Sequence, residues 1–128
     1  MNERALRAVL ILLGLAQLGI GCWMTFATSS FGRRVAPFDD VDLHDLRDFA
    51  TYYLALGIGL LFAAVRPAWR FPILALATLE YSLHTINHAI DINHANPVWV
   101  GPADLAAVAA TTVIFAWLAW RTAPRAKR

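Results

Sequence analysis

The chain has 128 residues, of which 59% are apolar, and its mean hydropathy is +0.51. Soluble domains usually contain about 45–50% apolar residues, so this composition argues against a soluble domain and favours an integral membrane protein. The formal net charge of +2 comes from basic residues that flank apolar runs, and no nucleic-acid partner is predicted. The single cysteine, Cys22, excludes an intramolecular disulfide and a cysteine-based metal site.

The first apolar run covers about residues 5–27 and follows two arginines, as a signal peptide would. Cys22 after Gly21 also has the form of a lipoprotein cleavage site. However, Gly19 stands where such sites need leucine or a similar residue, and the apolar run continues beyond Cys22. We therefore interpret this run as an uncleaved first membrane span. Gly14, Gln17 and Gly21 share a face of that helix on which another helix can pack closely.

Three further spans are predicted, at about residues 49–65, 71–90 and 102–120. Residues 28–48 read as a polar connection rich in aspartate. Pro67 ends the second span, and Gly101 with Pro102 begins the fourth. Each span has roughly the 17–25 residues that are needed to cross the hydrocarbon. The sequence thus predicts an all-α fold, an integral membrane antiparallel four-helix bundle that forms one domain over residues 1–128.

The distribution of basic residues predicts the orientation of this bundle. Eight of them lie at the two termini and between the second and third spans: Arg4, Arg7, Arg66, Arg70, Arg121, Arg125, Lys127 and Arg128. Three lie on the opposite side among five aspartates: Arg33, Arg34 and Arg47, with Asp39, Asp40, Asp42, Asp45 and Asp48. Because basic loops stay in the cytoplasm, both termini are predicted to be cytoplasmic and the protein to lie in the cytoplasmic (inner) membrane.

The third span carries a polar face made of Glu80, His84, Asn87, His88 and Asp91. At about 100° per residue these side chains fall within roughly a 100° arc. Ionisable groups within a bilayer are costly and usually mark a functional site. Counting inward from Phe71 at about 1.5 Å per residue, Glu80 lies near the midplane, while His84 and His88 lie in the outer half.

A second polar face lies on the second span and contains His44, Asp48, Thr51 and Tyr52. Its depth matches that of the first, so we predict one shared site with Asp48 and His88 about one hydrogen bond or one water apart. The candidate catalytic residues are Glu80, His84, His88 and Asp48. The candidate ligand-binding residues are His44, Tyr52, Asn87, Asp91 and Gln17.

Three interpretations of these residues remain open. In the first, Glu80 and His84 share a proton and act as general acid or base on a small lipophilic ligand that enters from the bilayer. In the second, His84 and His88, one helical turn apart, bind a divalent metal in a membrane oxidoreductase, with His44 or Asp48 as a further ligand. In the third, the polar residues only hold helices or a partner subunit together.

The length, the four spans, the Arg7-x6-Gly14 run and the Gly57-Ile58-Gly59 stretch resemble the DoxX-like group of small bacterial four-helix membrane proteins. Some members of that group are associated with quinone-linked oxidoreductase complexes. The resemblance therefore implies a quinone ligand, or a role as a non-catalytic subunit of a membrane redox complex or homo-oligomer. It carries over no functional residue, because the His84-Thr85-Ile86-Asn87-His88 motif is not assigned to that group.

Overall fold

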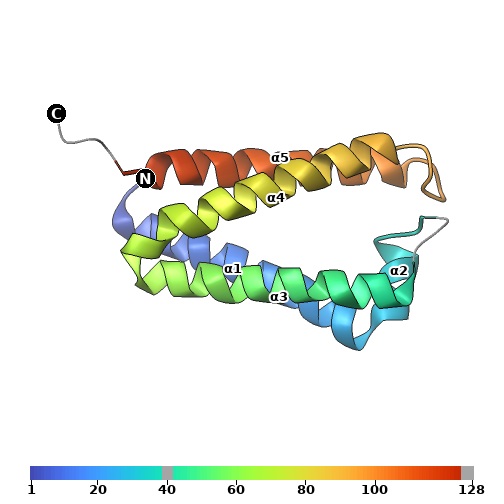
Figure 1. Cartoon of the computed structure of the whole chain (residues 1–128), viewed down its shortest axis with the longest axis horizontal. Helices are drawn as coiled ribbons and strands as arrows, with labels where there is room; N and C mark the ends of the chain where they lie inside the picture. Colours follow the sequence, from blue (N-terminus) through green and yellow to red (C-terminus); the bar gives the residue numbers. More distant parts are fainter. Residues whose placement is uncertain (39–41, 125–128) are drawn as a thin grey trace.

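The structure, a computed structural model, describes residues 1–38 and 42–124, and the predicted all-α fold is confirmed for them. Asp39, Asp40, Arg125, Lys127 and Arg128, which entered the orientation argument, lie outside the described residues. The helices, shown in Figure 1, are α1 (Glu3–Phe26), α2 (Thr28–Arg34), α3 (Leu43–Val65), α4 (Arg70–Ile90) and α5 (Val100–Thr122), with a 3₁₀ turn, η1 (Pro67–Trp69), before α4.

The largest differences from the predicted helices are an additional short helix and an earlier start of α3, each with a local reason. Helix α2 occupies part of the expected polar connection, because the chain turns at Ala27 and then buries Phe31. Helix α3 begins at Leu43 rather than near residue 49, because the Asp42 side chain caps it by accepting a hydrogen bond from the His44 N–H at 2.7 Å.

Helices α1, α3 and α5 are long and apolar enough to cross a membrane. Helix α4 has 21 residues but is not among the helices in the described part of the chain that meet this criterion. Its polar face explains the difference, because Glu80, His84, Asn87 and His88 lower the mean hydropathy of the helix. The composition of three helices thus indicates a membrane protein, and α4 is the helix that departs from the pattern.

The four long helices form two antiparallel pairs, α1 with α3 and α4 with α5, and α3 and α4 make the smaller contact that joins the pairs. Figure 1 shows the pairs converging near the N-terminus and separating toward α2 and the loop before α5. We call these the closed end and the cavity end. The predicted close packing at small residues is confirmed within the α1–α3 pair. A Cβ on Gly57 would lie 2.7 Å from Leu18 Cγ and 2.9 Å from the Gly14 carbonyl oxygen.

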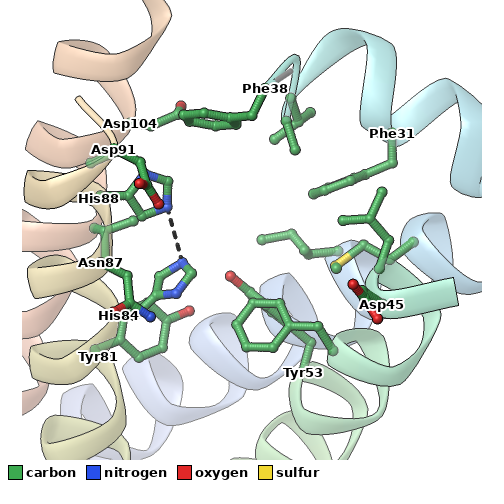
Figure 2. A pocket seen from close by; sticks show the side chains of 18 of the residues that line it. Phe31, Phe38, Asp45, Tyr53, Tyr81, His84, Asn87, His88, Asp91 and Asp104 are labelled. Carbon is green, nitrogen blue, oxygen red and sulfur yellow. Dashed lines mark hydrogen bonds between the residues drawn. The ribbon is translucent and has the colours of Figure 1, made fainter. Parts of the chain in front are cut away.

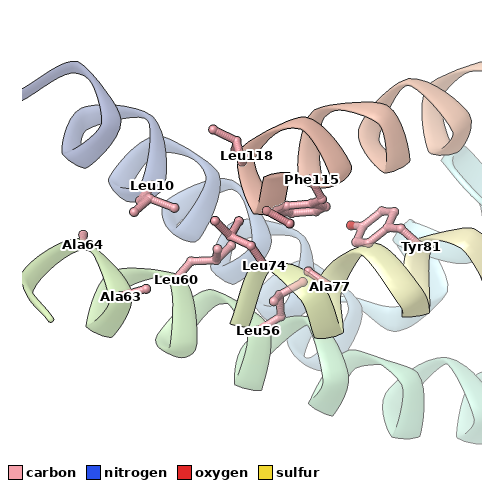
Figure 3. Packing of buried hydrophobic residues seen from close by; sticks show 11 residues of the cluster. Leu10, Leu56, Leu60, Ala63, Ala64, Leu74, Ala77, Tyr81, Phe115 and Leu118 are labelled. Carbon is pink, nitrogen blue, oxygen red and sulfur yellow. The ribbon is translucent and has the colours of Figure 1, made fainter. Parts of the chain in front are cut away.

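An apolar core joins the two pairs toward the closed end. Its members include fully buried side chains from all four long helices (Figure 3): Leu10, Leu60, Leu74, Phe115 and Leu118. Because these side chains interdigitate across both pairs, the pairs are fixed to one another here by burial of apolar surface.

An ion pair that the sequence did not reveal also fastens the closed end. Arg70 was expected in a loop, but it is the first residue of α4 and only 6% exposed. Its guanidinium donates to both carboxylate oxygens of Glu3, at 2.8 and 2.5 Å, and to the carbonyl oxygen of Ala63 at 3.2 Å. One side chain thus ties the start of α1 and the end of α3 to the start of α4.

The cavity end is joined by a backbone contact between the segment after α2 and the loop before α5. The Asn96 N–H donates to the Pro37 carbonyl at 2.8 Å, and Phe38 forms an isolated antiparallel bridge with Ala95. Gly101, predicted to begin the fourth span with Pro102, lies in the first turn of α5. A Cβ there would collide with the Ile92 carbonyl, so the close approach of this loop requires glycine.

Candidate functional site

A cavity of about 920 Å³ lies between the two helix pairs at the cavity end (Figure 2). One wall comes from α1, α2, α3 and the adjoining segments. It is mostly apolar, with Asp42 and Asp45 as its carboxylates: Ile20, Met24, Phe31, Val35, Ala36, Phe38, Asp42, Asp45, Leu46, Phe49 and Tyr53. The other wall comes from α4, α5 and the loop between them and is largely polar, with Tyr81, His84, Asn87, His88, Asp91, His94, Asp104 and Thr111. The cavity is therefore two-faced, like a site for a molecule with one polar edge.

His84 and His88 form the centre of the polar wall. Their Nε2 atoms are 3.2 Å apart, so one imidazole can donate its N–H to the other. Aromatic rings hold both: the Phe49 ring stacks on His84 with centroids 5.2 Å apart, and the Phe38 ring meets His88 edge-on at 5.8 Å. The predicted pairing of these two histidines is thus present in the structure, and it faces a cavity.

Hydrogen bonds between α4 and α5 fix the direction of the polar face. The Thr112 hydroxyl donates to the Tyr81 carbonyl at 2.9 Å and lies 2.9 Å from the Thr85 hydroxyl. Hydroxyl-containing side chains commonly join helices in this way in membrane proteins. Because Tyr81 and Thr85 flank His84, this contact sets the rotation of α4 that turns the histidine toward the cavity.

Gln17 lies behind the cavity rather than in it. It is 4% exposed, and its Nε2 donates to the Tyr81 hydroxyl at 2.7 Å. Tyr81 itself belongs both to the apolar core and to the cavity wall. Gln17, predicted as a ligand-binding residue, therefore positions a wall residue and is not among the residues that line the cavity.

Tyr52 and Glu80 lie near each other between α3 and α4, close enough to interact electrostatically. Even so, the Tyr52 hydroxyl and Glu80 Oε2 are buried and have no hydrogen-bond partner among the described residues. Neither residue lines the cavity, although Glu80 lies one helical turn from His84 on the same face of α4. A buried polar atom without a partner is a place where an ordered water can be held.

The second polar face is not where the sequence placed it. His44 Nε2 and Asp48 Oδ2 lie 3.5 Å apart on the surface, with side chains 76% and 72% exposed, and neither residue lines the cavity. The structure therefore does not bring Asp48 to His88. Gly57 packs on α1, and Asp48, nine residues earlier, lies about 180° around α3 from it, so the α1–α3 contact turns Asp48 outward.

Asn87 and Asp91 do line the cavity, as the sequence suggested for ligand-binding residues, and Asp91 Oδ1 lies 3.6 Å from His94 Nδ1. Sequence reasoning missed Asp45, Phe49, Tyr53 and Asp104. Asp45, Phe49 and Tyr53 follow one another at intervals of four residues, and this spacing indicates that they share one face of α3. Asp104 gave no signal beyond its position near the start of a helix.

Metal binding has a partial donor set here. The two imidazole nitrogens can both reach one ion, but residues 1–38 and 42–124 contain no group of three or more His, Cys, Asp or Glu side chains arranged to hold a metal. The metal interpretation stays a prediction. The resemblance to the DoxX-like group also stays a prediction, since comparison of the chain with protein-family models, with curated proteins and with solved structures finds no match.

Proposed function

We propose that this chain is a four-span protein of the inner membrane whose cavity binds a small lipophilic molecule and exchanges a proton with it through His84 and His88. The observation that carries the proposal is the imidazole pair, with Nε2 atoms 3.2 Å apart, on the polar wall of a cavity of about 920 Å³. Ligand sites in proteins are typically concave and mostly apolar, with a few convergent polar groups.

The packing of α4 supports its place as a fourth span. Its 21 residues rise about 32 Å, enough for a hydrocarbon core of about 30 Å, and it runs antiparallel to α5. Exposed tryptophans also lie near both ends of the long helices: Trp23, Trp69, Trp99, Trp117 and Trp120. Such belts mark membrane interfaces. With both termini cytoplasmic, as the basic residues favour, the cavity opens in the outer half of the bilayer.

The chemistry follows from the imidazole pair. When one ring donates its Nε2–H to the other, the outer nitrogen of each ring can still exchange a proton with a ligand hydroxyl or carbonyl. Histidine suits this task because its ordinary titration range includes neutral pH. Glu80, one turn deeper on the same face, provides a further proton-carrying group that has no hydrogen-bond partner at Oε2 among the described residues.

A neutral phenol tests this proposal. The probe is 2-naphthol, which is lipophilic and whose emission differs between its protonated and deprotonated forms. We expect protein in zwitterionic-lipid nanodiscs to raise the deprotonated emission above that of empty nanodiscs, and the His84→Gln/His88→Gln double variant to remove that increase. His44→Gln is the matched control, since His44 is exposed and outside the cavity. Equal loss in the double variant and the control would contradict the proposal.

The second candidate is a metal site, which the short distance between the two Nε2 atoms favours. Zinc–nitrogen bonds of about 2.0–2.1 Å would allow both rings to bind one ion from the positions they hold. Elemental analysis separates the two candidates. Stoichiometric metal that is lost in the double variant but kept in His44→Gln would replace the acid–base interpretation with the metal one.

A further inference from the structure

The cavity lining contains several carboxylates but no lysine or arginine among the described residues. Four of the lining residues are aspartates, namely Asp42, Asp45, Asp91 and Asp104, and three are histidines. An anion entering this space would meet carboxylates on both walls and no permanent positive charge to balance it.

The four aspartates differ in whether they already form a hydrogen bond or a salt bridge within the protein. Asp42 caps α3, and Asp91 lies against His94. Asp45 and Asp104 stand on opposite walls, and no salt bridge among the described residues includes either of them. Asp104 is half-buried on α5, near His88, and Figure 2 shows it beside the Phe38 ring. It is therefore the carboxylate best placed to meet a ligand inside the cavity.

The other groups around this space are aromatic. Phe31, Phe38, Phe49, Tyr53 and Tyr81 all contribute to the lining. The faces of such rings attract cations, most strongly where water is excluded. They do not replace the water shell of a small inorganic ion. A positive charge surrounded by carbon is the ligand to which both the aspartates and the rings are complementary.

We infer that the cavity selects lipophilic organic cations over neutral or anionic molecules of the same size. A cation of this class that also carries a hydroxyl or carbonyl group can exchange a proton with the histidine pair, whereas a quaternary cation without such a group probes the charge selection alone. The inference rests on the proposed function, because it names the class of ligand for the same cavity. In this arrangement Asp104 and Asp45 supply the attraction, the aromatic rings contact the apolar substituents, and the histidine pair lies beside the bound charge.

Two ions of nearly the same size and shape test the selectivity. The probes are tetraphenylphosphonium, a cation, and tetraphenylborate, an anion, measured by equilibrium dialysis against nanodiscs with and without protein. We expect protein-dependent binding of the cation only. Asp104→Asn should weaken it at least about tenfold, which is the effect of removing a unit charge about 10 Å away at an effective dielectric of about 20. Asp48→Asn, the same change at an exposed carboxylate outside the cavity, should leave binding unchanged.

Folding of each variant is checked by thermal melting and by its response to 2-naphthol. Equal binding of the two probes, or equal weakening by Asp104→Asn and Asp48→Asn, would overturn the cation selectivity. If 2-naphthol gives its histidine-dependent signal but the phosphonium does not bind, the ligand class is wrong and the proposed function stands. If neither probe responds to the protein, both proposals fail.

Discussion

The closed end and the cavity end of this molecule use the same four helices in opposite ways. At the closed end the buried core is apolar, and Arg70, the one charged side chain buried among the described residues, is hydrogen-bonded to Glu3 and the end of α3. At the cavity end, imidazoles and carboxylates face open space, and nearby polar atoms lack partners among the described residues. The larger apolar core thus lies at the closed end, while the open, partly polar lining and a smaller apolar cluster (Met24, Phe31, Leu46 and Ala50) lie at the cavity end.

Two phenylalanines allow the sharpest test of this division. Phe115→Ala removes a fully buried ring from the core and should cost about 3–5 kcal/mol of unfolding free energy. Phe49→Ala removes the ring that stacks on His84 at the cavity wall, so we expect a smaller loss of stability but a clear loss of the 2-naphthol signal. Thermal unfolding followed by circular dichroism measures the first effect. A larger stability loss for Phe49→Ala would reverse the assignment of the two ends.

Substitution of two glycines on α3 tests whether the close packing of α1 on α3 is required. Gly57→Ala places a methyl group against Leu18 and the Gly14 carbonyl oxygen, and the backbone atom cannot move aside, so we expect a loss of about 1–3 kcal/mol. Gly59→Ala has its nearest neighbour, Ile73 Cδ1, at 3.5 Å and should be neutral, or stabilising by about 0.5–1 kcal/mol. Equal melting temperatures for the two variants would show that the close approach is not needed.

Tyr81 lies at the boundary between the two ends. Of the three comparisons, its substitution is expected to cause the smallest loss of stability. Tyr81→Phe keeps the ring in the core and the cavity wall but breaks the hydrogen bond with Gln17, which should cost about 1 kcal/mol. Thr78→Val is the control, because among the described residues the Thr78 hydroxyl bonds to the Leu74 carbonyl of its own helix and to no other helix. Denaturant unfolding compares the two, and a loss no greater than that of Thr78→Val would remove Tyr81 as a link between the ends.

The parts of the fold that depend on local sequence could be predicted. The apolar runs predicted the long helices, and the four-residue spacing of His84 and His88 predicted that their side chains are neighbours. Helix α2 was missed because its sequence, Thr-Ser-Ser-Phe-Gly-Arg-Arg, is polar except for one phenylalanine. This short helix packs through one buried ring, that of Phe31, and its own composition does not indicate that the ring is buried.

The candidate site was only half predictable, because one of its walls depends on how α3 is rotated. That rotation follows from the contact of Gly57 with Gly14 and Leu18 on α1, which involves residues far apart in the sequence. The polar residues His44 and Asp48 were the more conspicuous on α3, yet Asp45, Phe49 and Tyr53 are the ones that face the cavity. Polarity alone does not say which side of a helix faces its neighbours when lipid headgroups and water can also receive polar side chains.

Each wall of the cavity belongs to a different helix pair, and this division has a mechanical consequence. A small rotation of one pair about the core and the Arg70–Glu3 ion pair would widen or narrow the space without breaking a contact within either pair. The contacts that cross between the pairs at this end would resist it, namely the Pro37–Asn96 hydrogen bond, the Phe38–Ala95 bridge and the stacking of Phe49 on His84. Such a rotation would change the width of the cavity and the distance between Asp45 and Asp104, while the polar groups of the α4–α5 wall keep their mutual positions.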